Sequence, residues 1–124
     1  MALHRGGVTS ADPSAEYYTE ERCHILVTDA VDDADVSLAR ARVEPGVTTA
    51  RHSLTGVDER YVLIAGEGLV EVGADDPALV GPGDVVAIPA GVGQRITNTG
   101  TTDLVFLCIC TPPFRPECYL DLEQ

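Results

Sequence analysis

Residues 46–66 read GVTTARHSLTGVDERYVLIAG, and residues 83–98 read GDVVAIPAGVGQRITN. In both stretches glycine bounds apolar runs rich in Val, Ile and Leu, which polar residues interrupt at short intervals. Short apolar runs separated by turn residues are typical of β-strands. His52 and Leu54 lie two residues apart, so they share one face of a strand. We expect the turn that follows to bring Glu59 back towards them.

The spacing of glycines and polar residues resembles the two paired motifs of the cupin superfamily. The matching anchors are Gly46, His52, Glu59 and Gly66 in the first motif, and Gly83, Pro89, Gly91 and Asn98 in the second. Leu54 and Gln94 stand where the family has its second and third histidines. The resemblance spans residues 36–111 and implies an all-β fold, an antiparallel double-stranded β-helix of the jelly-roll type.

The rest of the chain agrees with an all-β domain, because no segment has a helical period and turn signals recur about every ten residues. The predicted strands are residues 23–28, 36–43, 48–54, 59–65, 68–72, 78–80, 84–88, 94–98 and 104–111. We expect an N-terminal arm over residues 1–22, a barrel over 23–111, and a tail over 112–124. The tail should pack on the barrel, with Phe114 and Tyr119 as anchors.

Composition limits the classes of function. The 124 residues include 20 acidic and 8 basic side chains, a formal net charge of −12. Such a surface repels phosphate backbones and anionic lipids, so it disfavours nucleic-acid and membrane partners. No apolar run approaches the length that crosses a bilayer, and no secretory signal opens the chain, so we expect a cytoplasmic protein.

The four cysteines are not spaced as Cys-x-x-Cys pairs, and we expect reduced thiols. Cys108 and Cys110 share a face of one strand. The simplest interpretation is that they are buried small hydrophobic residues. The alternative is that they line the barrel interior, or form a secondary thiolate site with Cys118.

The resemblance implies that His52, Glu59 and Gln94 converge inside the barrel and hold a divalent metal. An imidazole nitrogen, a carboxylate and an amide oxygen suit Mn, Fe, Zn or Ni, and leave positions open for a ligand. Leu54 makes one wall apolar, which favours a small ligand with an oxygenated end and a hydrocarbon or ring body. Taken singly, His52 is more typical of a hydrogen-bonded core or pocket histidine, and Gln94 of a polar side chain at the start of a strand. Glu59 alone could form an exposed ion pair with Arg60.

Tyr61 has the same strand parity as Glu59, so we expect its hydroxyl in the pocket and name Glu59 and Tyr61 as the candidate catalytic residues. Arg51 and Arg95 should point to the opposite face of their strands. Asn98 is expected to serve a turn or cap the backbone.

Three classes of function remain open. The first is a metal-dependent isomerase, lyase, cyclase or dioxygenase that acts on a small oxygenated molecule. The second is a metal-free enzyme or binding module in which His52 is the acid or base. The third is a sensor or accessory barrel without catalysis. In each case we expect a homodimer, because open sheets leave strand edges that association can cover.

Overall fold

The computed structural model describes residues 8, 10–28 and 35–123, and within these ranges the fold consists of β-strands and two short 3-10 helices. The helices are η1 (Pro13–Ala15) and η2 (Pro116–Cys118). The strands are β1 (Tyr17–Tyr18), β2 (His24–Val27), β3 (Ser37–Val43), β4 (His52–Leu54), β5 (Asp58–Ala65), β6 (Gly68–Val72), β7 (Ala78–Val80), β8 (Val85–Ile88), β9 (Gln94–Asn98), β10 (Leu104–Thr111) and β11 (Tyr119–Asp121).

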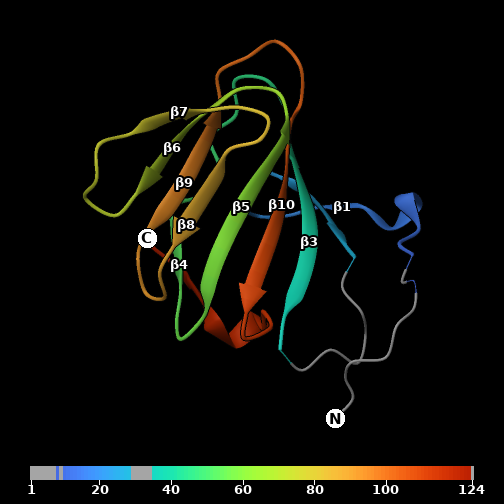
Figure 1. Cartoon of the computed structure of the whole chain (residues 1–124), viewed down its shortest axis with the longest axis vertical. Coiled ribbons are helices and arrows are strands. Elements are labelled where there is room, and N and C mark those ends of the chain that lie inside the picture. The colour runs from blue at the N-terminus through green and yellow to red at the C-terminus, as the bar shows by residue number, and fades with distance from the viewer. Residues whose placement is uncertain (1–7, 9, 29–34, 124) are drawn as a thin grey trace.

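The strands form two antiparallel sheets that face each other (Figure 1). The larger sheet has the order β1-β2-β3-β10-β5-β8, and the smaller has the order β11-β4-β9-β6-β7. Neighbours such as β3 and β10 are far apart in sequence, as expected when a chain winds back and forth between two sheets. The prediction of an all-β antiparallel architecture is confirmed.

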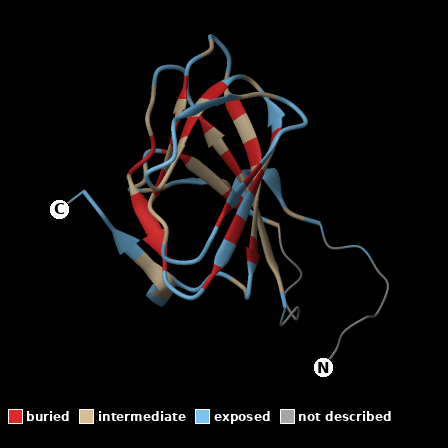
Figure 2. Cartoon of the chain, turned by 60° about the vertical axis from the view of Figure 1, so that its left-hand side comes forward, coloured by how far each residue is buried: buried red, intermediate tan, exposed pale blue. Residues whose placement is uncertain are grey.

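The core lies between the sheets, and buried residues alternate with more exposed ones along strands such as β5, β8 and β9 (Figure 2). Leu63, Ile88 and Leu104 from the larger sheet, and Ile96 from the smaller, are at most 2% exposed. Burying each such side chain contributes about 2 kcal/mol before the entropy of ordering is subtracted. This packing holds the two sheets at a fixed separation.

Two motif residues serve the backbone. Gly66 has a φ of +85°, and a Cβ there would lie 2.6 Å from the carbonyl oxygen of Asp103, so only glycine fits the turn. Asn98 is 1% exposed, and its Nδ2 donates to the carbonyls of Val43 and Thr102 at 2.9 and 2.8 Å. The structural role predicted for Asn98 is therefore confirmed.

The predicted strand that differs most from the structure is the one that contains His52. Residues 48–54 were expected to form a single strand, but β4 begins at His52, and Thr48 makes only an isolated bridge with Thr97. The reason is that the backbone before His52 bonds to other partners. The amide of Ala50, for example, donates to the carbonyl of Glu21 at 3.0 Å.

The chain ends also join the sheets. In the predicted arm, residues 1–7 and 9 lie outside the described residues, but β1 pairs with β2 and extends the larger sheet. At the other end, β11 pairs with β4, with Asp121 opposite His52. Among the described residues, no helix is both long enough and apolar enough to cross a bilayer.

Candidate functional site

A cavity of about 310 Å³ opens on the inner face of the larger sheet. Residues of four neighbouring strands line it, at alternate positions as the two-residue period of a strand predicts, apart from Leu38 of β3. They are Ile25 and Val27 from β2, Ser37, Ala39 and Ala41 from β3, Phe106, Cys108 and Cys110 from β10, and Glu59 and Tyr61 from β5. His52 and Leu54 of β4 contribute a wall from the smaller sheet, and Phe114 and Tyr119 contribute another from the tail.

His52 is held on two sides. Its Nδ1 lies 2.9 Å from the carbonyl oxygen of Ala50, so Nδ1 carries a proton and donates it. The ring stacks on Tyr119 with centroids 4.9 Å apart and an interplanar angle of 17°. When the ring is neutral, its lone pair is on Nε2, the nitrogen that a proton, a ligand or a metal would use.

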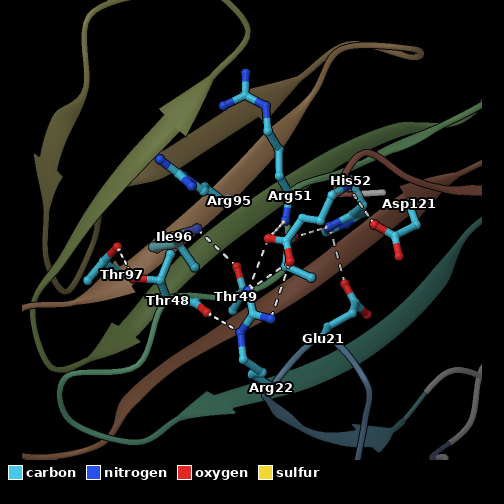
Figure 3. Close-up of polar contacts among 12 residues, drawn as sticks. Glu21, Arg22, Thr48, Thr49, Arg51, His52, Arg95, Ile96, Thr97 and Asp121 are labelled. Carbon is cyan, nitrogen blue, oxygen red and sulfur yellow. Dashed lines mark hydrogen bonds and ion pairs between the residues drawn. The ribbon is translucent and has the colours of Figure 1, made fainter.

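A third contact comes from the N-terminal segment. Oε1 of Glu21 lies 3.3 Å from Nδ1 of His52, as Figure 3 shows. Burial raises the pKa of Glu21, and the proximity of His52 opposes part of that rise. A carboxylate beside Nδ1 favours the tautomer with the free lone pair on Nε2.

The turn that carries Glu21 is fixed to the smaller sheet. Its next residue, Arg22, has a φ of +67° and donates through Nε to the carbonyl of Thr48 at 2.8 Å (Figure 3). Arg22 also pairs with Glu123 at 3.0 Å. The turn therefore connects the start of the chain, the loop before β4 and the C-terminal residues.

Glu59 is the buried carboxyl group of the cavity, only 7% exposed. Its Oε2 accepts a weak hydrogen bond from the thiol of Cys110 at 3.6 Å, whereas its Oε1 has no hydrogen-bond partner. Burial raises the pKa of Glu59, while Gln94 and His52 oppose part of the rise. A buried acceptor without a partner costs about 1 to 3 kcal/mol, so a donor placed there gains that stabilisation.

Gln94 lies directly across from His52 in the register of β4 and β9 and is fully buried. Its Oε1 accepts a hydrogen bond from the hydroxyl of Tyr61, and its Nε2 has no hydrogen-bond partner. The amide is close enough to Glu59 to lower its pKa, although no hydrogen bond of good geometry joins the two side chains. Gln94 thus stands behind the cavity wall rather than on it.

The phenol of Tyr61 points into the same polar cluster. Burial raises its pKa well above the usual value, with a further contribution from the charge of Glu59. Tyr61 therefore remains a neutral phenol whose proton is directed at Gln94. The ring also packs on Phe106, with centroids 4.4 Å apart, and so forms part of the apolar wall.

The three predicted metal ligands are brought together, but they do not offer three donors to the cavity. His52 and Glu59 line it, whereas the carbonyl oxygen of Gln94 is occupied by Tyr61. In residues 8, 10–28 and 35–123, no three His, Cys, Asp or Glu side chains are grouped so that they could hold a metal ion. As arranged, His52 and Glu59 face the cavity, while Gln94 lies behind its wall.

Cys108 and Cys110 border the cavity, as the alternative interpretation expected, and Cys110 is also buried, as the simplest interpretation expected. Cys23, for which no place in the site was predicted, borders the cavity as well. All are free thiols. Burial raises the pKa of Cys23 to about 12 and also raises the pKa of Cys108 and Cys110. The thiols are thus neutral near pH 7 and act as small, weakly polar wall residues.

The structure also places the two arginines that were expected to point away from the site. Arg95 faces away from the cavity and pairs with Glu71 at 2.7 Å, while Arg51 is partly exposed and also lies off the cavity wall. Sequence reasoning did not select Glu21, because nothing in the acidic segment around it marks one carboxylate as special. It also did not place Tyr17, Phe106 and Phe114 in one site, since they are far apart in the chain.

Comparisons with known proteins agree with this architecture. The family model of the cupin domain matches residues 39–110. An oxalate-binding protein of Thermotoga maritima is 34% identical over 90 residues, which cover 72% of this chain and 73% of that protein.

Two solved structures show the same fold. The Streptomyces nucleoside dehydratase Pac13 has a TM-score of 0.76 at 13% identity, with 94% of this chain and 92% of that chain covered. Oxalate decarboxylase of Lactobacillus farciminis has a TM-score of 0.75 at 22% identity, with 86% of this chain but 33% of that chain covered. The double-stranded β-helix expected from the sequence is confirmed, and the chain belongs to the cupin family.

Proposed function

We propose that this cupin binds a small organic molecule in the barrel cavity without needing a divalent metal. The observation that carries the proposal is the unpartnered Oε1 of Glu59, a buried acceptor on the wall of a cavity of about 310 Å³. A pocket of this size, mostly apolar with few polar groups, is typical of small-molecule sites. The ligand would place a donor group at Glu59.

The remaining walls support a two-part ligand. His52 and Glu21 form the other polar surface, while Leu54, Phe106 and Ile25 provide apolar contact. A ligand with an apolar body along these side chains and a hydrogen-bonding head group at Glu59 would match both the apolar and the polar walls. The likeness to an oxalate-binding protein supports small-molecule binding in general terms.

The test is a screen of small polar organic compounds by protein-observed NMR, with chelator-treated protein and with protein supplied with Mn, Fe, Zn or Ni. We expect compounds that shift cavity resonances equally in both samples, and that no longer bind when Ala39→Leu fills part of the cavity. Binding that appears only with metal would overturn the proposal. It would favour the competing proposal, a metal held by His52, Glu59 and Gln94.

Elemental analysis of protein purified without a histidine tag separates the same two proposals directly. The metal-free proposal expects less than stoichiometric metal in the wild type. About one metal per chain that disappears in Glu59→Gln would instead establish the three-residue metal site.

Proton transfer is a second candidate function, favoured by two groups that face one cavity. His52 is held in the tautomer with its lone pair on Nε2, and burial raises the pKa of Glu59, which makes its carboxylate a stronger base. Such a pair can remove a proton from a bound molecule and return it. We expect a bound carbonyl compound to exchange a proton for deuterium in heavy water, and we expect this exchange to be lost in His52→Gln and Glu59→Gln. If no exchange is observed, binding without proton transfer is the function that remains.

We also propose a homodimer. The edge strand β8 exposes Val85 (59% exposed), and Leu79 of β7, at the edge of the smaller sheet, is 77% exposed. Light scattering after size-exclusion chromatography tests this, with a mass of one chain as the contradicting result.

A further inference from the structure

The aromatic residues of the chain are concentrated at one place. The sequence has two phenylalanines, four tyrosines and no tryptophan. Five of these six side chains line the cavity, namely Tyr17, Tyr61, Phe106, Phe114 and Tyr119. They come from β1, β5, β10 and the tail, so only the tertiary structure brings them together. Aromatic faces attract cations as well as rings and hydrocarbon groups.

The charges around the cavity have one sign. Glu21 and Glu59 are the carboxyl groups of its wall, and no Arg or Lys is among the described residues that line it. Among the lining residues that the structure describes, His52 alone has a basic side chain, and its Nδ1 already faces Glu21. Glu59 is more than nine-tenths buried, and its Oε1 has no partner.

The approach to the cavity is acidic as well. A groove of about 580 Å³ adjoins it and shares Tyr17, Thr19, Glu21 and Tyr119 with it. The groove is also lined by Glu20, Asp121 and Glu123, while Arg22, the one cation among the described residues that line it, already pairs with Glu123. A negative entrance concentrates positive ligands and repels anions.

We propose that the ligand of this cavity is an organic amine in its cationic form, with its ammonium group at Glu59 and Glu21 and its apolar body against the aromatic walls. This inference rests on the proposed binding function and names the chemical class of its ligand. It uses two independent features, the unpartnered buried acceptor of Glu59 and the clustering of aromatic side chains on a cavity wall without Arg or Lys.

Other ligand charges fit less well. A carboxylate ligand would have to enter against Glu21 and Glu59, with no Arg or Lys among the described lining residues to receive it and with Nδ1 of His52 already facing Glu21. A neutral alcohol can donate to Oε1 of Glu59, but it leaves the negative charge of the site uncompensated. An ammonium group supplies both the donor and the charge.

The experiment compares ligands that differ only in the head group. The probes are phenethylamine, 2-phenylethanol and 3-phenylpropanoate, with hexylamine, hexanol and hexanoate as an alkyl series. Binding to the full chain is measured by calorimetry at neutral pH and low ionic strength. We expect each amine to bind about tenfold or more tightly than the matching alcohol, and the acids to bind more weakly still.

Matched variants assign the preference to the cavity. Glu59→Gln keeps the shape and removes the charge, so the amine should lose about tenfold or more in affinity and its advantage over the alcohol should disappear. Glu67→Gln removes the same charge from an exposed turn and should change affinity by less than about twofold. Nuclear Overhauser contacts from the bound amine to Phe106 and Tyr119 should be observed.

The failures can be told apart. If an alcohol or an acid binds as tightly as its amine, and Ala39→Leu abolishes that binding, the cavity binds small molecules but the amine inference is overturned. Amine binding that is unchanged in Glu59→Gln also overturns it. If none of the six probes binds and the wider screen finds no cavity ligand, both the inference and the proposed function fail.

Discussion

The barrel strands and the two terminal segments build different parts of one cavity. Strands β4, β5 and β9 hold His52, Glu59 and Gln94 between 0% and 7% exposed, within ladders that pair on both sides of each strand. Residues 17–22 and 114–121 cover the same site with side chains such as Tyr17 and Phe114, which are 53% and 43% exposed. The strands position the polar groups, and the terminal segments shape the mouth and the access to them.

This difference suggests that the strands determine the stability of the fold and that the terminal segments determine which ligands enter the cavity. Groups on paired strands open only when a large part of the fold opens, whereas segments fixed by a few hydrogen bonds can open locally. We expect substitutions in the strands to change the free energy of unfolding, and substitutions in the terminal segments to change the cavity with little effect on the fold.

The largest expected effect on the free energy of unfolding is in Asn98→Ala, a substitution in the barrel strands. The substitution leaves the carbonyls of Val43 and Thr102 and the amide of Gly100 without the partner they have in the wild type. The free energy of unfolding should fall by about 2 to 4 kcal/mol, because buried groups that lose their partners are costly. Denaturant unfolding measures this, and a loss below the error of the method would contradict the structural role of Asn98.

The second-largest effect is expected in Glu59→Gln, which should increase the free energy of unfolding instead of lowering it. Burial raises the pKa of Glu59 above its unfolded value, so its contribution to stability is fully present below the unfolded pKa and is lost as pH rises through the folded pKa. The neutral amide avoids that loss, and the variant should be more stable than the wild type by about 1 to 3 kcal/mol at pH 7.

The pH dependence makes the comparison specific. The stability advantage of Glu59→Gln should shrink as pH falls towards about 4, where the wild-type carboxyl is protonated in both states. Glu59 is also faced by Glu21, His52 and Cys110, whose charges can affect stability. The free energies of unfolding of the variants are therefore compared with that of the wild type at the same pH. Glu67→Gln, with the same charge change at an exposed position, should show no such advantage. An advantage that does not vary with pH would contradict this cause.

The smallest effect on stability is expected on the terminal side, in Arg22→Ala. The variant loses the hydrogen bond to Thr48 and the exposed ion pair with Glu123, so the free energy of unfolding should fall by only about 1 kcal/mol. The amide of Ala50, which donates to Glu21, should lose hydrogen-exchange protection at least about tenfold. Amides of β10 should keep theirs. Equal losses at both places would mean that the turn and the barrel open as one unit.

Much of the fold could be predicted from local patterns. The predicted strands at residues 68–72, 78–80, 94–98 and 104–111 have the observed bounds, because apolar alternation and turn residues are written directly in the chain. The loop before His52 could not be predicted, since its backbone partners, such as Glu21 for Ala50, lie far away in sequence.

The site was predictable only in part. Strand parity placed Glu59 and Tyr61 on one face, and both line the cavity. The partnership of Tyr61 with Gln94 was not predictable, because it depends on the distance between side chains of two different sheets. That hydrogen bond takes one of the two lone pairs of the amide oxygen of Gln94.

The sequence by itself determined the all-β architecture, the turns at Gly66 and Asn98, and the strand face that Glu59 and Tyr61 share, because these depend on local backbone preferences and on the two-residue period of strands. Only the tertiary structure decided that Glu21 lies beside His52, that five aromatic side chains line one cavity, and that the oxygen of Gln94 is already bonded. Such facts depend on contacts between distant segments, which form when the two sheets and both chain ends pack around a common interior.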